Sequence, residues 1–118
     1  MLSNFYNIDK DLLIEFLLYN QEHIDNIKFT IKKLQNINQK SQIQLLLQQI
    51  LKDLNEIQNS AIFLNLKDIV KLTNKIIDIV IQFISDTTIS ISSNTIISVL
   101  ERSVATLEII FQKLNLLS

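Results

Sequence analysis

The chain has 118 residues, a formal net charge of -1, and no glycine, proline or cysteine. The near-neutral charge, without a long basic or acidic run, argues against electrostatic binding to nucleic acid or to an anionic membrane. The absence of cysteine excludes disulfides, thiolate catalysis and cysteine metal sites.

Because the two strongest helix breakers are missing, the chain is expected to be all-α, with Asn, Asp and Ser forming its turns. Its length suits one domain covering residues 1-118. Met1 to Tyr6 lacks the basic and apolar segments of a signal peptide. The richest apolar run, Ile76 to Ile84, contains Asp78 and Gln82 and is too short to span a bilayer. We therefore expect a cytoplasmic protein without membrane insertion.

Apolar residues recur at steps of three and four, which places them on one face of a helix. This spacing predicts helices over approximately 9-35, 41-63, 66-85 and 93-115, packed as an antiparallel four-helix bundle. Asp9 or Asn7 would cap the first helix and Ser41 the second. The stretch from Ser85 to Asn94 is rich in β-branched and capping residues, so its connection is expected to be non-helical. The expected core positions are Leu13, Phe16 or Leu17, Asn20, Ile24, Ile27, Ile31, Leu34, Leu46, Ile50, Leu54, Ile57, Ala61, Leu64, Leu66, Ile69, Val70, Thr73, Ile76, Ile77, Val80, Phe83, Ile84, Ile96, Leu100, Val104, Leu107, Ile110 or Phe111, and Leu114.

The third helix carries more apolar residues than one buried stripe requires. They cover most of its circumference: Ile69, Leu72, Ile76, Ile77, Ile79, Val80, Ile81, Phe83 and Ile84. Such a helix is either central in the bundle, which we favour, or partly exposed for a partner.

The segment from Ile50 to Leu66 resembles the phosphoacceptor helix of histidine phosphotransfer (Hpt) domains of CheA-type kinases. That helix reads His-Thr-Leu-Lys-Gly-Ser-Ala-Gly between apolar residues, and Ser60, Ala61, Leu64 and Leu66 fall in register with it. Leu12 to Ile27 looks like the first helix of the same family, and Ile89 to Asn94 like the entry into its fourth. The resemblance covers most of the chain and implies an Hpt-like four-helix bundle.

The positions of the family's phosphoryl site are all altered. In register, Asn55 replaces the phosphoacceptor histidine, Gln58 a lysine and Asn59 a glycine, while Asn74 and Ile77 replace a second histidine and a glutamate. Phosphoryl transfer through histidine needs an imidazole nucleophile tuned by a neighbouring carboxylate. An amide supplies neither, so the resemblance implies a module that does not carry phosphate.

Other catalytic chemistry finds little support in the chain. His23 is the only histidine and flanks the apolar row of its helix, and a histidine occurs at the matching place in many CheA-type domains without accepting phosphate. One hypothesis is nevertheless a phosphotransfer protein that uses His23, and we rank it below the two that follow. Glu15, Asp25, Asp53 and Glu56 lack the spacing of a transition-metal site. We expect no enzyme activity, no metal and no cofactor.

The leading hypothesis is a binding module in two-component or chemotaxis-type signalling that docks a receiver or histidine kinase domain. The residues expected on its docking face are Gln48, Leu51, Lys52, Asn55, Gln58, Asn59 and Ile62. Leu51 and Ile62 would either anchor a partner or widen the core stripe. The alternative is a structural bundle that forms a homodimer or a permanent assembly through the third helix, where Ile77 and Ile81 would matter.

Overall fold

The computed structural model describes residues 9–85 and 93–117, and throughout these ranges the regular structure is α-helical. The elements are α1 (Lys10–Leu34), α2 (Lys40–Phe63), α3 (Lys67–Ser85) and α4 (Ser93–Leu117). Each boundary lies within two residues of the one that apolar periodicity predicts, so the expectation of four helices in this order is confirmed.

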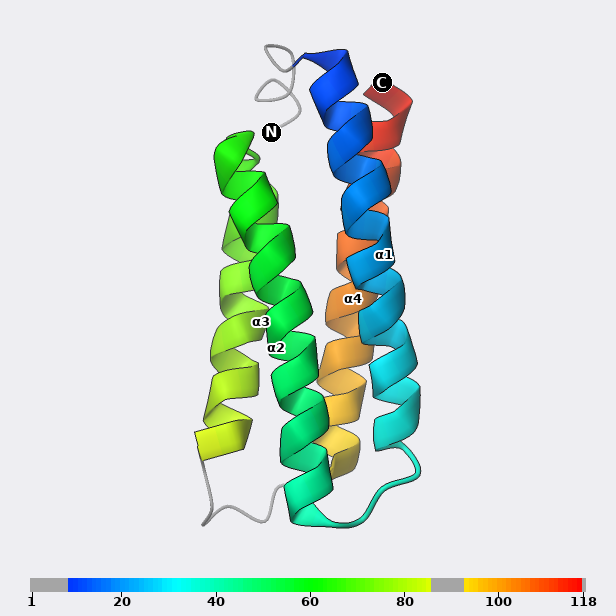
Figure 1. Ribbon diagram of the computed structural model, residues 1–118, viewed down its shortest axis with the longest axis vertical. Coiled ribbons are helices and arrows are strands. Elements are labelled where there is room, and N and C mark those ends of the chain that lie inside the picture. Colours follow the sequence, from blue (N-terminus) through cyan, green and yellow to red (C-terminus); the bar gives the residue numbers. More distant parts are fainter. Residues whose placement is uncertain (1–8, 86–92, 118) are drawn as a thin grey trace.

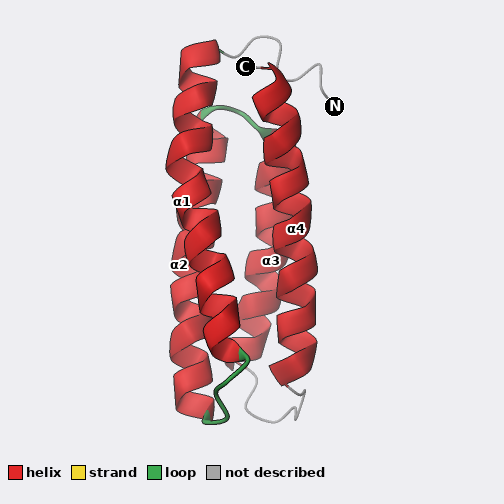
Figure 2. Cartoon of the chain, turned by 90° about the vertical axis from the view of Figure 1, so that its right-hand side faces the viewer, coloured by secondary structure: helices red, strands yellow, loops and turns green. Residues whose placement is uncertain are grey.

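The four helices run antiparallel to their neighbours and form a closed ring of contacts (Figure 1). α1 packs on α2, α2 on α3, α3 on α4, and α4 returns to pack on α1. Figure 2 shows the resulting elongated bundle from the side, and its principal extents are 46 × 21 × 18 Å. Within the described residues, no helix combines the length and the apolarity that crossing a membrane requires.

The core follows the predicted apolar rows closely. Of the expected positions, Leu17, Leu64, Val70, Phe83, Ile84 and Ile110 are half-buried and pack against the core; the others are buried. Leu47 and Ile97 are also buried, because each apolar stripe is wider than a single row. Among the described residues, three polar ones are buried: Asn20, Thr30 and Thr73. The hydroxyls of Thr30 and Thr73 donate to the carbonyl one turn earlier.

The helix starts differ in how they are capped. The carboxylate of Asp9 accepts a hydrogen bond from the backbone N–H of Asp11 at 2.8 Å, which confirms Asp9 as the cap of α1. The prediction that Ser41 caps α2 is wrong, because the helix begins at Lys40 and places Ser41 in its first turn. Gln39 holds the cap position without a side-chain hydrogen bond.

The third helix is not central, which corrects our favoured reading. α3 occupies one corner of the ring and packs chiefly on α2 and α4. Its surplus apolar residues are distributed outward: Leu72, Ile79 and Phe83 are half-buried, and Ile81 is 43% exposed. The alternative, a partly exposed apolar helix, describes α3 as it lies in the fold.

Part of the predicted connections lies outside the described residues. This applies to Met1–Tyr6, to the alternative cap Asn7 and to positions 86–92 of the expected non-helical stretch. Of that stretch, Ser85 is the last residue of α3, while Ser93 and Asn94 belong to α4.

The turn between α2 and α3 is built around Asn65. Its φ of 59° is the only positive φ among the described non-glycine residues. The N–H of Leu66 bonds the carbonyl of Ala61 at 2.8 Å, and the N–H of Asn65 bonds that of Ile62 at 3.0 Å. These two bonds form a Schellman motif, in which the residue after the helix cap is left-handed. With no glycine in the chain, Asn is the residue that tolerates this conformation best.

Leu66 is the last residue of the turn and directly precedes α3. Its side chain is fully buried, and its carbonyl accepts from the N–H of Ile69 and of Val70, both at 3.1 Å. One buried residue therefore closes α2 and opens α3, which fixes the two helices as a tight antiparallel pair.

We expect Asn65→Val to lower the free energy of unfolding by about 1 to 2 kcal/mol, because a β-branched residue is strained in the left-handed region. Asn65→Gly should leave it unchanged or raise it. Urea denaturation followed by circular dichroism measures both. Equal loss in the two variants would show that the Asn side chain matters and its backbone conformation does not.

Candidate functional site

The helix that resembles the phosphoacceptor helix, α2, has two flanks, one toward α3 and one toward α1. Asn55, which the resemblance aligns with the phosphoacceptor histidine, is exposed, and so is Asn59 one turn later. On the next helix Asn74 is exposed, whereas Ile77 is buried in the core. The surface around Asn55 is therefore open, and Ile77, where the family has a glutamate, adds no polar group to it.

Gln58 turns toward α3 and joins it through an amide network. Its side-chain nitrogen donates to Oδ1 of Asn74 at 2.6 Å and to Oγ1 of Thr73 at 3.2 Å, with the carbonyl of Val70 at 3.4 Å. The hydroxyl of Thr73 donates in turn to the carbonyl of Ile69 at 2.8 Å. The bonds join neutral groups, so this network links two helices but offers no nucleophile or charge for phosphoryl chemistry.

The register of α2 against α3 follows from two interhelical bonds. Besides Gln58 to Asn74, the amide of Gln44 donates to the carbonyl of Ile84 at 3.2 Å near the other end of the pair. In an antiparallel pair these two links place Asn55 near the level of Ile77, and Leu51 near that of Ile81. Asn55 of α2 and Ile77 of α3 therefore lie at about the same level of the bundle.

The residues of the expected docking face differ in burial. Gln48, Lys52 and Asn55 are exposed, and Ile62 is 56% exposed. Leu51 is half-buried and packs against the core, so it widens the core stripe. Ile62 is consequently the apolar residue of this face that a partner could cover.

The face continues onto α3 beside Ile62. A shallow pocket of about 380 Å³ is lined by Ile62, Asn65, Lys67, Val70, Lys71 and Asn74. Lys67, Lys71 and Lys75 follow one another at four-residue spacing and are all exposed. We call the surface formed by Asn55, Asn59 and Ile62 of α2 with Lys67, Lys71 and Asn74 of α3 the α2/α3 face.

The other flank of α2 meets α1 through a second polar cluster. Nδ1 of His23 lies 2.8 Å from a carboxylate oxygen of Asp53, and both side chains are mostly buried. The ring of Tyr19 packs edge-on against His23 with centroids 5.1 Å apart, and its hydroxyl donates to Glu56 at 3.4 Å. An ionised carboxylate only accepts, so Nδ1 of His23 must carry the proton of this bond.

This cluster orients one imidazole but assembles no further catalytic group around it. Among the described residues, no three His, Cys, Asp or Glu side chains come close enough to hold a metal ion. The pairing of His23 with Asp53 joins residues 30 positions apart and was not anticipated from the sequence. The signal that could have found it is that both residues flank the apolar rows of two adjacent helices.

Comparison with protein-family models, curated proteins and solved structures found no match for this chain. The likeness to Hpt domains therefore rests on the residues quoted above, and the fold adds four antiparallel helices in the expected order.

We expect neutral His23 to hold its proton on Nδ1, whereas free histidine prefers Nε2. Two-bond ¹⁵N–¹H correlation spectra of the imidazole distinguish the two tautomers. Asp53→Ala should return the ring to the Nε2–H form. Asp25→Ala, which removes an exposed carboxylate from α1, the helix of His23, should leave the tautomer unchanged. An unchanged tautomer in Asp53→Ala would contradict the assignment.

Proposed function

We propose that the chain is an Hpt-like docking module that binds a receiver or histidine kinase domain without carrying phosphate. The observation that supports this most is the exposure of Asn55 on a helix that otherwise follows the phosphoacceptor pattern. A surface at that level remains open to a partner, and an amide at its centre cannot accept a phosphoryl group as an imidazole does.

The chemistry of the α2/α3 face suits a protein partner. Ile62 supplies an exposed apolar side chain, and the amides of Asn55, Asn59 and Asn74 supply donors and acceptors that a partner's backbone can match. Lys67 and Lys71 at its edge favour a partner with acidic groups around its own apolar contact. Binding of this kind would hold a signalling domain in place and leave its phosphate where it is.

A second candidate is self-association through the same helices. It is favoured by Ile81, which is 43% exposed on α3, together with Ile62 on α2. Ile77, the other residue assigned to this role, lies in the core, so a change there would act on folding. Sedimentation equilibrium distinguishes this candidate from docking, because a homodimer forms without any added partner.

We expect Ile62→Asp to abolish capture of purified receiver or kinase domains from the same organism, because a carboxylate would be buried without a partner at the contact. Leu18→Asp is the matched control, since Leu18 is 70% exposed on α1, outside the α2/α3 face. Circular dichroism verifies that both variants keep their helices, and calorimetric titration measures binding.

Loss of binding in Ile62→Asp alone supports the docking face. Equal binding by both variants, or no binding by the wild type at micromolar concentration, contradicts it. Dimerisation of the wild type that Ile62→Asp or Ile81→Asp disrupts would favour the second candidate.

Restoring the missing nucleophile tests the docking geometry by its chemistry. Asn55→His places an imidazole at an exposed position of the face. If a receiver docks here, its aspartyl phosphate should pass the phosphoryl group to that ring: an N–P bond forms, the O–P bond breaks and the carboxylate is released. We expect acid-labile label on Asn55→His, none on the wild type, and none on the double variant with Ile62→Asp.

Label on the wild type that disappears in His23→Ala would overturn the proposal in favour of a phosphotransfer protein that uses His23. Label on Asn55→His that persists with Ile62→Asp would show that transfer occurs without the proposed contact.

A further inference from the structure

The outward side of α1 carries two pairs of exposed residues that complement each other. In the first half of the helix, the exposed Glu15 is followed by Leu18, which is 70% exposed. In the second half, Phe29 is 60% exposed and is followed by the exposed Lys33. Residues three and four apart are neighbours on a helix surface, so each pair joins one charge to one large apolar side chain. The two charges are opposite in sign.

The ammonium and the ring of the second pair lie together. Nζ of Lys33 is 4.7 Å from the centroid of the Phe29 ring, which is a cation–π contact. The neighbouring cations Lys28 and Lys32 belong to the side of α1 that faces α4, where they line a groove with Glu108. Lys33 is therefore the cation that accompanies Phe29 on the outward side.

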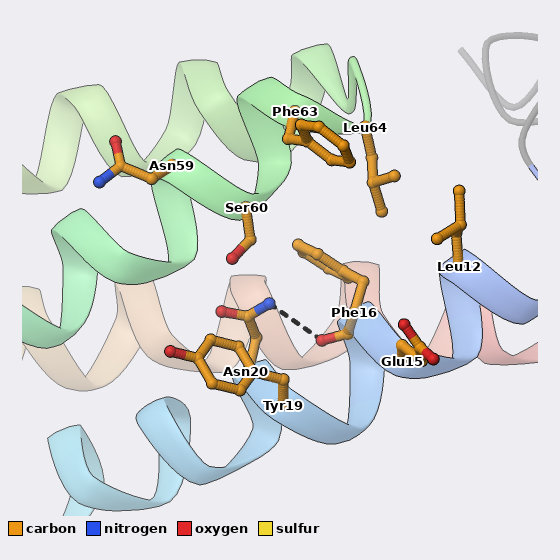
Figure 3. A pocket seen from close by; sticks show the side chains of 9 residues that line it. All are labelled: Leu12, Glu15, Phe16, Tyr19, Asn20, Asn59, Ser60, Phe63 and Leu64. Atoms are coloured by element: carbon orange, nitrogen blue, oxygen red, sulfur yellow. Dashed lines mark hydrogen bonds between the residues drawn. The ribbon is translucent and has the colours of Figure 1, made fainter.

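The other side of α1 faces α2 across the groove shown in Figure 3. Phe16 and Asn20 point toward α2 there, and Glu15 lies at the edge of the groove. Since α1 packs on α2 and on α4, the side between the two grooves faces solvent. The two complementary pairs lie on this side.

The spacing of the two pairs is self-complementary. Glu15 and Lys33 are eighteen residues apart, or five full turns, so they lie on one line along the helix. Leu18 and Phe29 are eleven residues apart, or about three turns. The midpoint of the first two residues falls at position 24 and that of the second two at position 23.5. One twofold axis at this level therefore brings Glu15 onto Lys33, and Leu18 onto Phe29, of a second copy.

The signs of the charges fix the direction of such a pair. In a parallel pair each residue would face its own copy, so Glu15 would meet Glu15, and like charges repel. In the antiparallel pair both ends are matched. Glu22 and Asp25 are also exposed on this side and flank the twofold axis, so their carboxylates oppose the association at its centre.

We propose that two copies of the chain associate antiparallel through the outer α1 face, the surface formed by Glu15, Leu18, Glu22, Asp25, Phe29 and Lys33. Leu18 of each copy packs on Phe29 of the other, and Glu15 pairs with Lys33 at both ends of the contact. A second copy is the occupant that the pattern identifies, because it supplies both complementary groups at the required spacing. The contact is isologous, so it closes at two copies.

This dimer is distinct from self-association through α2 and α3. α1 and α3 lie on opposite sides of the bundle, as Figure 1 shows. The α2/α3 face therefore stays accessible in both copies, and the proposal does not depend on the docking function.

Sedimentation equilibrium of the full chain measures the association. We expect the wild type to dimerise, and Leu18→Asp and Phe29→Asp each to weaken the dimer at least tenfold, because a carboxylate would enter an apolar contact. Leu45→Asp is the matched control, since Leu45 is 61% exposed on α2, outside the outer α1 face, and it should dimerise as the wild type does. Circular dichroism verifies that the variants keep their helices.

Charge reversal tests the antiparallel pairing on exposed residues that do not affect folding of the core. Glu15→Lys and Lys33→Glu should each weaken the dimer about tenfold, because two attractive pairs become repulsive. The double variant should restore the affinity of the wild type. Glu22→Gln should strengthen the dimer severalfold, because it removes repulsion at the axis.

Disulfide formation tests the register, since the chain has no cysteine of its own. In the presence of oxidised glutathione, a mixture of Leu18→Cys and Phe29→Cys should form a covalent dimer. Leu18→Cys alone should not, because its two copies would lie about 16 Å apart along the helix, which is too far for a disulfide.

A monomeric wild type at millimolar concentration would overturn the proposal. A dimer that survives both Leu18→Asp and Phe29→Asp, or one that Ile62→Asp or Ile81→Asp disrupts instead, would overturn it as well, since the contact would then lie elsewhere. A double charge reversal that binds more weakly than either single variant would contradict the antiparallel pairing.

Discussion

The geometry of the α2/α3 face depends on the turn at Asn65, which reverses the chain between α2 and α3. The left-handed backbone of Asn65 and the burial of Leu66 keep the connection between α2 and α3 short and fixed. The two helices therefore pack in one register. Gln58 then reaches Asn74 and Thr73, and Gln44 reaches the carbonyl of Ile84. A looser loop would allow α3 to slide along its apolar stripe, and the polar contacts between the helices would be lost.

The two flanks of α2 differ in chemistry because they face different neighbours. Toward α3 the helix offers neutral amides, an exposed Ile62 and lysines at the edge. Toward α1 it offers carboxylates, which are matched by His23 and by the hydroxyl of Tyr19. The two flanks of one helix of twenty-four residues therefore present different chemistry to solvent and to the neighbouring helices.

The neutral amides between α2 and α3 also have a structural consequence. An amide network between α2 and α3 is neutral, so it holds the helices together without the cost of burying charge. The buried isoleucine at position 77 adds apolar contact where a glutamate would need a partner. The neutral amides and Ile77 therefore favour packing of this helix pair.

The sequence by itself determined the helices, their order, most of the core and the lack of an imidazole at position 55, because apolar periodicity and residue chemistry are local properties. It could not determine which flank of each stripe faces which neighbour, since this depends on how the helices rotate and slide when they pack. Only the tertiary structure decided that Leu51 is half-buried and Ile62 exposed, that α3 occupies a corner, and that His23 meets Asp53.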